Sequence, residues 1–236
     1  MSELVQYELD GAIATITIDD GKLNVFSIAM LNALHGALDR AEHDGAVVLL
    51  RGRERCFSTG FDMNVFAQGP ERILEMLTLG ATLAERVLSF ARPVLVACSG
   101  HAIAAGTFLP LAADVRIGVD GPFQIGLNEV KIGLTVPSFA IELARGRLAP
   151  AQFDAAVVGA QMYDPAGAVE AGFLDRVVAA DELDEASLAT AAALAELNGP
   201  AHAATKLRAR AGTLGKLREA IEGELTAANL QAALAA

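Results

Sequence analysis

The chain lacks several features that would point to a particular class of protein. It has no Trp, only 5% aromatic residues, and two cysteines, Cys56 and Cys98, in 236 residues. Two cysteines so placed suit neither a disulfide framework nor a thiolate metal site, so we expect reduced thiols. The four histidines show no His-x-x-x-His spacing, and no Cys-x-x-Cys pair occurs. The sequence therefore predicts no bound metal.

Basic residues are also scarce. Lys and Arg number 18 against 29 Asp and Glu, which gives a net charge of −11. Sequence-independent binding of nucleic acid requires clustered Lys and Arg to neutralise phosphates, so we expect no nucleic-acid partner. This charge remains compatible with an anionic small molecule bound at a local site.

Targeting, membrane and nucleotide-binding signals are missing as well. The start, MSELVQYELDG, has no basic region followed by an apolar run, so we expect a cytoplasmic protein without a secretory signal. Residues 93–113 are uncharged, but the glycines and prolines within them predict a buried strand, a turn and a buried helix rather than a membrane span. No G-x-G-x-x-G, P-loop or G-x-S-x-G motif occurs.

The patterns that are present predict an α/β domain. Asp10-Gly11 indicates an opening β-hairpin, and Ser27 and Gly45 are typical of the two ends of a helix. Strands and helices then alternate, with a helix from Pro70 and another bounded by Asp164 and Gly172. From residue 181 onward we expect helices alone, broken near residues 198–200.

Two turns rich in small residues, FSTGFD at 57–62 and SGHAIAAG at 99–106, each follow a buried strand. Small residues allow the backbone to approach a ligand closely, and a turn that enters a helix leaves N–H groups unpaired. Two such turns placed side by side could direct two N–H groups at one oxygen, as in an oxyanion hole. Each turn alone is a weak signal.

Three segments in order, CFSTGFDM, ACSGHAIAAGTFLPLAADVRI and FQIGLNEVKIGLTVP, resemble the crotonase (enoyl-CoA hydratase/isomerase) superfamily. The resemblance runs from about residue 5 to 210 and implies a spiral of ββα units with a helical C-terminal region. It divides the chain into a core, residues 1–195, and helices, residues 196–236, that serve oligomerisation and cover the active site. It also implies a homotrimer or a dimer of trimers.

The resemblance further implies an acyl-CoA thioester as substrate, with coenzyme A entering as part of it and no separate cofactor. The backbone N–H groups of Phe61 and Ala105 would hold the enolate oxygen. The resemblance places substrate and CoA contacts at the following residues: Lys22, Leu23, Thr59, Gly60, Met63, Gly106 and Phe108. The chain has no basic, aromatic tail of the kind that covers CoA in many relatives.

Two glutamates deliver water in the hydratases of this family, and their positions here hold Phe108 and Glu129. One carboxylate can instead take a proton from C2 of a 3-enoyl thioester and return it at C4. IGLNE resembles the catalytic segment of the mitochondrial-type Δ3,Δ2-enoyl-CoA isomerases, so isomerisation is favoured. Hydration of a 2-enoyl-CoA and non-catalytic acyl-CoA binding stay open as alternatives.

Other charged residues have structural explanations. Without the motif, Glu129 would be expected to pair with Lys131 or Arg145 on the surface. We expect a backbone carbonyl to hold the His101 ring, and Glu142 to be a solvated helical residue. Asp62 and Asp114 are expected to cap turns or helices. A basic set in the C-terminal region could contact CoA phosphates or form a solvated face: Lys206, Arg208 and Arg210.

Overall fold

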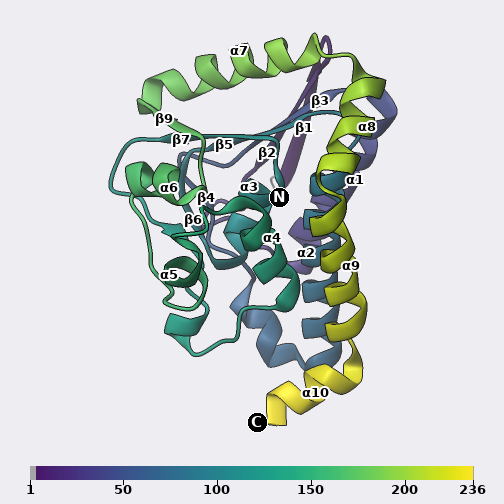
Figure 1. Cartoon of the computed structure of the whole chain (residues 1–236), viewed down its shortest axis with the longest axis vertical. Coiled ribbons are helices and arrows are strands. Elements are labelled where there is room, and N and C mark those ends of the chain that lie inside the picture. The colour runs from purple at the N-terminus through teal and green to yellow at the C-terminus, as the bar shows by residue number, and fades with distance from the viewer. Residues whose placement is uncertain (1–3, 236) are drawn as a thin grey trace.

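The computed structural model describes residues 4–235, and two β-sheets organise them (Figure 1). The large sheet has six strands in the order β1-β2-β3-β5-β7-β9, and the small sheet has three in the order β4-β6-β8. Among the paired strands of residues 4–235, only β1 and β2 are antiparallel, as expected for the opening hairpin, and the other strand pairs are parallel. The strands are β1 (Val5–Asp10), β2 (Ile13–Ile18), β3 (Val47–Arg51), β4 (Arg55–Ser58), β5 (Val94–Cys98), β6 (Gly100–Ile103), β7 (Val115–Val119), β8 (Ile125–Gly126) and β9 (Arg176–Val178).

The same strand-strand-helix unit occurs three times along the described chain. A strand of the large sheet leads into a strand of the small sheet and then into a helix, so the units are β3-β4-α2, β5-β6-α3 and β7-β8-α4. This is the predicted ββα spiral, followed by helices. The helices are α1 (Ile28–Asp44), α2 (Pro70–Ser89), α3 (Phe108–Ala112), α4 (Ser138–Arg147), α5 (Phe153–Val157), α6 (Pro165–Ala171), α7 (Leu183–Ala195), α8 (Gly199–Ala209), α9 (Ala211–Glu224) and α10 (Ala227–Ala235).

Local capping signals placed the helix ends correctly. The Ser27 side chain accepts a hydrogen bond from the Met30 N–H, and Gly45 closes α1 in the left-handed conformation. Asp164 and Gly172 bound α6 in the same way. The prediction of a turn over residues 99–106 was partly wrong, because Gly100–Ile103 pairs with β4 as strand β6. The turn itself is the short 3-10 helix Ala104–Thr107.

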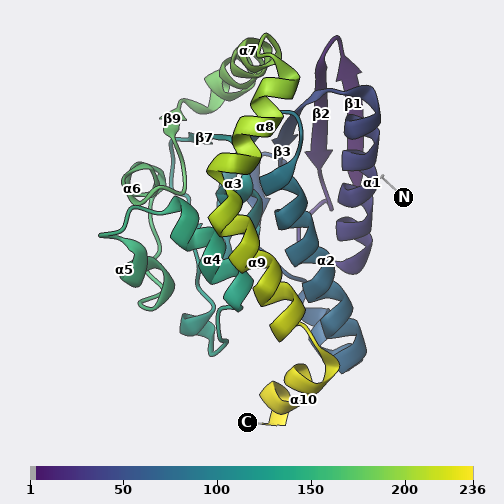
Figure 2. The same cartoon turned by 45° about the vertical axis from the view of Figure 1, so that its right-hand side comes forward.

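The uncharged stretch 93–113 forms β5, β6 and α3; the first strand and the helix were predicted, and β6 stands where a turn was expected. Among the described residues, no helix is both long enough and apolar enough to cross a membrane. The predicted break between the last helices occurs at Asn198, but two further breaks, at Arg210 and after Glu224, were missed. Helix α9 packs against α2 and α4, and α10 also contacts α2 (Figure 2). A division of the chain at residue 195 stays a prediction.

Asp114 joins the C-terminal helices to the core. Its carboxylate lies 2.7 Å from Lys206 Nζ and 2.9 Å from Arg210, and it accepts a hydrogen bond from the Val94 N–H. The expected capping role of Asp114 is therefore wrong, because its oxygens are used by long-range partners. The expected phosphate contacts or solvated face are also wrong for Lys206 and Arg210, since Lys206 is buried and both pair with Asp114.

Candidate active site

The three strands of the small sheet all end at one place. Strands β4, β6 and β8 are parallel neighbours, so their carboxyl ends lie at the same edge of the sheet. The segment after β4 carries Phe61, the segment after β6 carries Ala105, and the segment after β8 carries Glu129. This topology explains why residues far apart in the sequence meet at one site.

The turn after β4 is fixed by buried polar groups. Ser58 Oγ donates to the Asn24 carbonyl at 2.7 Å and accepts the Gly60 N–H at 3.1 Å. The side chains of Ser58 and Asn24 are fully buried. The Asn24 side-chain amide in turn donates to the carbonyls of Ile18 and Phe57. Gly60 has φ of 93°, which a residue with a side chain rarely adopts. A rigid turn therefore precedes Phe61.

The turn after β6 lies directly against the first. A Cβ on Gly60 would lie 3.0 Å from the Ala105 nitrogen, and a Cβ on Gly106 would clash with the Ser58 carbonyl. These two glycines thus allow the backbones to touch. Ala104 has φ of 52°, an unfavourable left-handed conformation for a residue with a Cβ. Backbone strain is therefore located immediately before Ala105.

The N–H groups of Phe61 and Ala105 are both available. The Phe26 N–H donates to the Gly60 carbonyl at 2.7 Å, and the Asp62 N–H donates to the Phe26 carbonyl at 3.3 Å. These bonds flank Phe61 and leave its own N–H directed away from Phe26. Within residues 4–235, neither the Phe61 N–H nor the Ala105 N–H donates a hydrogen bond. Two adjacent unpaired donors are the arrangement that an oxyanion requires.

Glu129 is a buried and uncompensated acid. The residue is 6% exposed, and its Oε2 atom has no hydrogen-bond partner among the described residues. Burial raises the pKa of this carboxyl from 4.5 to about 7. No ion pair within the described chain includes Glu129; Arg145, one expected surface partner, pairs with Glu142 instead. A surface salt bridge therefore does not explain Glu129.

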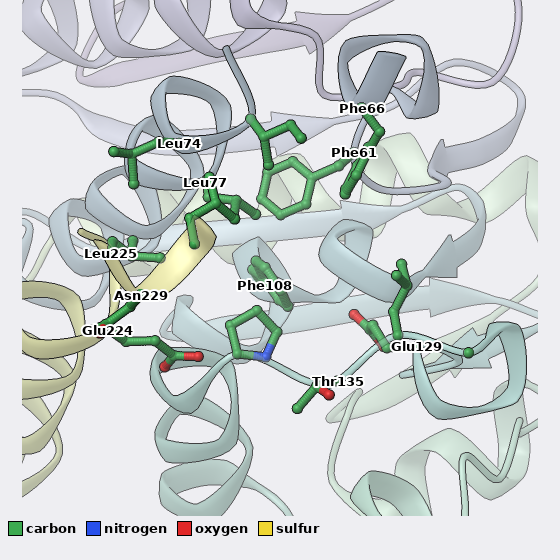
Figure 3. A pocket seen from close by; sticks show the side chains of 15 residues that line it. Phe61, Phe66, Leu74, Leu77, Phe108, Glu129, Thr135, Glu224, Leu225 and Asn229 are labelled. Carbon is green, nitrogen blue, oxygen red and sulfur yellow. The ribbon is translucent and has the colours of Figure 1, made fainter. Parts of the chain in front are cut away.

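Glu129 faces a cavity of about 400 Å³ that also contains the Phe61 and Phe108 side chains (Figure 3). Phe108 lies edge-on to Phe61, with ring centroids 5.9 Å apart, and edge-on to Phe139 at 5.3 Å. The remaining walls were missed by sequence reasoning and come from the 3-10 helix Met63–Gln68, α2, the segment before α4, and the C-terminal helices with the connection between them. They are formed by Phe66, Ile73, Leu74, Leu77, Gly133, Leu134, Thr135, Pro137, Glu224, Leu225, Asn229 and Leu230.

Glu224 is the second carboxylate of the cavity, but it already has a structural partner. Its Oε2 atom accepts the Ser138 N–H at 2.7 Å, at the start of α4. Figure 3 places Glu224 and Glu129 on opposite sides of Phe108. No sequence signal marked Glu224, because its closeness to the site depends on how α9 packs against α4.

Of the predicted substrate and CoA contacts, Phe108 lines this cavity, and the others do not: Lys22, Leu23, Thr59, Gly60, Met63 and Gly106. The Thr59 N–H donates to the Leu23 carbonyl at 3.1 Å, so the loop that contains Lys22 and Leu23 lies beside the first turn. Leu23 and Met63 are 55% and 56% exposed, which is unusual for large apolar side chains. The structure thus brings Lys22, Leu23 and Thr59 together at the surface.

The other candidates have local explanations. Asp62 accepts from the Asn64 N–H and caps a short 3-10 helix, as predicted. Glu142 was expected to be solvated, but it is half-buried and pairs with Arg145 and Lys216. The partner predicted for His101 was wrong, because His101 Nδ1 accepts the Gln124 N–H at 3.0 Å instead of donating to a carbonyl.

Neither metal nor thiol chemistry is indicated. The described part of the chain contains no group of three or more His, Cys, Asp or Glu residues arranged to hold a metal ion. Both cysteines are buried, and burial raises the pKa of Cys56 to about 11 and of Cys98 to about 12. These thiols are poor nucleophiles at neutral pH.

Similarity to known proteins identifies the family. A family model described as enoyl-CoA hydratase/isomerase matches residues 8–231. The solved structure of an enoyl-CoA hydratase/isomerase family protein from Pseudomonas syringae is 48% identical with a TM-score of 0.92, covering 94% of this chain and 96% of that one.

Two curated relatives have different names. A probable enoyl-CoA hydratase of Bacillus subtilis is 31% identical over 140 residues, which cover 58% of this chain but only 54% of that protein. The human mitochondrial enoyl-CoA delta isomerase 1 is 24% identical over 219 residues, covering 91% of this chain and 72% of the relative. With the spiral fold and the match across most of its length, this chain belongs to the enoyl-CoA hydratase/isomerase family, the crotonase superfamily.

Proposed function

We propose that this protein moves the double bond of a 3-enoyl-CoA into conjugation and so yields a 2-enoyl-CoA, with Glu129 as the acid/base. The observation that carries this proposal is the isolation of Glu129, a buried carboxylate whose Oε2 atom has no partner among the described residues. A pKa of about 7 allows the group both to accept and to return a proton near neutral pH.

In the proposed reaction, ionised Glu129 removes a proton from C2 of the substrate, and the electron pair moves onto the thioester oxygen. The Phe61 and Ala105 N–H groups hold the resulting enolate oxygen. Protonated Glu129 then returns the proton at C4 as the double bond forms between C2 and C3. One carboxylate is sufficient because the same proton leaves and returns, so no water or redox partner is consumed.

Phe108 favours this reaction over hydration. Adding water across the 2,3 double bond in the manner of the family requires a second carboxylate beside Glu129. Phe108 instead fills that position with an apolar ring that packs against Phe61 and Phe139. Glu224 is a poor replacement because its carboxylate already holds the start of α4.

The cavity also suggests how the acyl chain lies. Leu74, Leu77 and Leu225 form an apolar region on the far side of Phe108 from Glu129 (Figure 3). An aliphatic tail that extends from C4 toward α2 and α10 would be buried there. The CoA portion would then leave past the exposed loop of Lys22, Leu23 and Thr59, beside Met63. Assembly into a homotrimer or a dimer of trimers and a cytoplasmic location stay predictions.

The test measures the ultraviolet absorbance of the conjugated thioester as a 3-enoyl-CoA is converted by wild type and Glu129→Gln. We expect the variant to lose about 10³-fold in kcat, in the range typical of a lost general base. Glu142→Gln, the same substitution at a paired surface glutamate, serves as the control and should keep wild-type activity. Equal rates for wild type and Glu129→Gln would reject the proposal.

Two further measurements separate the alternatives. Hydration of crotonyl-CoA at a rate comparable to isomerisation would identify a hydratase instead. Thermal stabilisation by acyl-CoA without turnover of any enoyl-CoA would identify a non-catalytic binding protein.

A further inference from the structure

We propose that the Thr107 hydroxyl is a positioning group that orients the Ala105 N–H toward the thioester oxygen. This inference rests on the proposed function, because it gives that N–H its role. Thr107 is fully buried, and its Oγ1 atom donates to the Ala104 carbonyl at 2.7 Å.

The inference follows from the geometry of one peptide group. The Ala104 carbonyl and the Ala105 N–H belong to the same planar unit, and no peptide bond of the described chain is cis. In a trans peptide the C=O and N–H bonds point in opposite directions. A hydrogen bond that fixes the Ala104 oxygen therefore also fixes the direction of the Ala105 N–H. It also polarises the peptide group, which makes that N–H a better donor.

The other proposed donor is held in the same way. The Phe61 N–H shares its peptide group with the Gly60 carbonyl, which accepts the Phe26 N–H at 2.7 Å. Both donors are thus fixed through the carbonyl on the opposite side of the peptide. At Phe61 the restraint comes from a neighbouring backbone segment, and at Ala105 it comes from a side chain. Thr107 is therefore the restraint that mutagenesis can remove.

The strained conformation of Ala104 explains why the Ala104–Ala105 peptide needs the hydrogen bond from Thr107. A left-handed residue with a Cβ is strained, so the turn tends to relax toward another conformation. A change of φ at Ala104 to a negative value would relieve the strain, and it would also move the Ala104–Ala105 peptide that follows and turn the N–H away. The Thr107 hydrogen bond opposes that movement.

The chain contains a matched residue without this role. Thr82 Oγ1 donates to the Thr78 carbonyl at 2.8 Å, one turn back in the regular helix α2. Such hydrogen bonds are common for threonines in helices and by themselves indicate nothing functional. Thr82 is half-buried and does not line the cavity, so its substitution reports the general effect of losing a threonine hydroxyl bonded to a backbone carbonyl.

The experiment compares Thr107→Val, Thr107→Ser and Thr82→Val in steady-state isomerisation of a 3-enoyl-CoA. Valine keeps the shape of threonine without the hydroxyl, whereas serine keeps the hydroxyl without the methyl group. We expect Thr107→Val to lower kcat about 10-fold with KM within about twofold, a part of the 10²- to 10³-fold loss for a missing oxyanion donor. Thr107→Ser and Thr82→Val should stay within about twofold of wild type. Equal loss in Thr107→Ser and Thr107→Val would show a packing role and overturn the inference.

A spectroscopic measurement separates this inference from the proposed function. The infrared carbonyl band of a bound 2-enoyl-CoA, labelled with ¹³C at the thioester carbon, reports polarisation of that oxygen without turnover. We expect the band to shift to lower frequency on wild-type enzyme and to return part of the way on Thr107→Val. A shifted band that depends on Thr107 in a protein without isomerase activity would reject the proposed function alone. An unchanged band in Thr107→Val, with an isomerising wild type, would reject the inference alone.

Discussion

Two carboxylates, the half-buried Asp114 and the buried Glu129, are held in opposite ways by this fold. Asp114 has two cations and a backbone N–H within 2.9 Å. Glu129 is buried, but its Oε2 atom has no partner within residues 4–235, and burial raises its pKa to about 7. A fully paired acid joins parts of the structure, whereas an unpaired one retains its tendency to take a proton. The contrast separates a structural charge from a chemical one.

The largest expected effect on stability comes from breaking the ion pairs of Asp114. Asp114→Asn removes the negative charge and leaves the buried Lys206 and the partly buried Arg210 without a counter-ion. We expect a loss of about 3 to 5 kcal/mol in the free energy of unfolding, which is typical when one partner of a buried pair is removed. Guanidinium denaturation at pH 7 measures it.

Lys206→Met is the matched variant for that experiment. Asp114 then keeps Arg210 at 2.9 Å, and the apolar side chain replaces a buried lysine whose pKa burial has already lowered to about 8. The loss should be about 1 to 2 kcal/mol. Equal losses from the two substitutions would contradict the central position of Asp114.

The second prediction concerns how much the unpaired carboxylate of Glu129 lowers the free energy of unfolding. The pKa of Glu129 is about 7 in the folded protein and 4.5 as its ordinary value, so the folded state binds more protons between these pH values. Wild-type stability therefore falls as pH rises through this window, by roughly 3 kcal/mol. The glutamine of Glu129→Gln does not titrate, so its stability should not fall in this way. The free energy of unfolding of the variant, measured relative to wild type, should therefore be higher at pH 8 than at pH 4.5. Unfolding curves at both pH values check this, and a constant difference would argue against it.

The prediction with the smallest expected effect tests whether the exclusion of water from the cavity raises the pKa of Glu129. Leu134 lines the same cavity, and its N–H donates to the Glu129 carbonyl. Leu134→Ala would admit water, so the midpoint of the pH–rate profile should fall by about half a unit, or roughly 0.7 kcal/mol. Leu207→Ala, at an exposed leucine of α8, is the control and should leave the midpoint unchanged. An upward shift in Leu134→Ala would contradict desolvation as the cause.

The sequence predicted the parts of this molecule that depend on local chemistry. Ser27, Gly45, Asp164 and Gly172 marked helix ends correctly because capping depends on residues within one turn. The family motifs identified the fold and directed attention to Glu129, although no comparison assigns the site residues themselves.

Long-range packing could not be predicted in this way. The sequence suggested a cap at Asp114 and phosphate contacts or a solvated face at Lys206 and Arg210, because the pairing of these three residues depends on how distant helices dock. Glu224 and Leu225 were missed for the same reason: nothing in a helical pattern states which cavity its side chains will reach.

The closure of the cavity by α9 and α10 links chemistry to local unfolding. These helices and the connection between them contribute Glu224, Leu225 and Leu230; α9 packs against α2 and α4, and α10 contacts α2. If they detach while the two sheets stay folded, water reaches Glu129 and its carboxyl regains the pKa of an ordinary acid. The proposed base would then stop working in a molecule that is still mostly native. Inactivation on mild heating should therefore precede loss of the β-sheet signal.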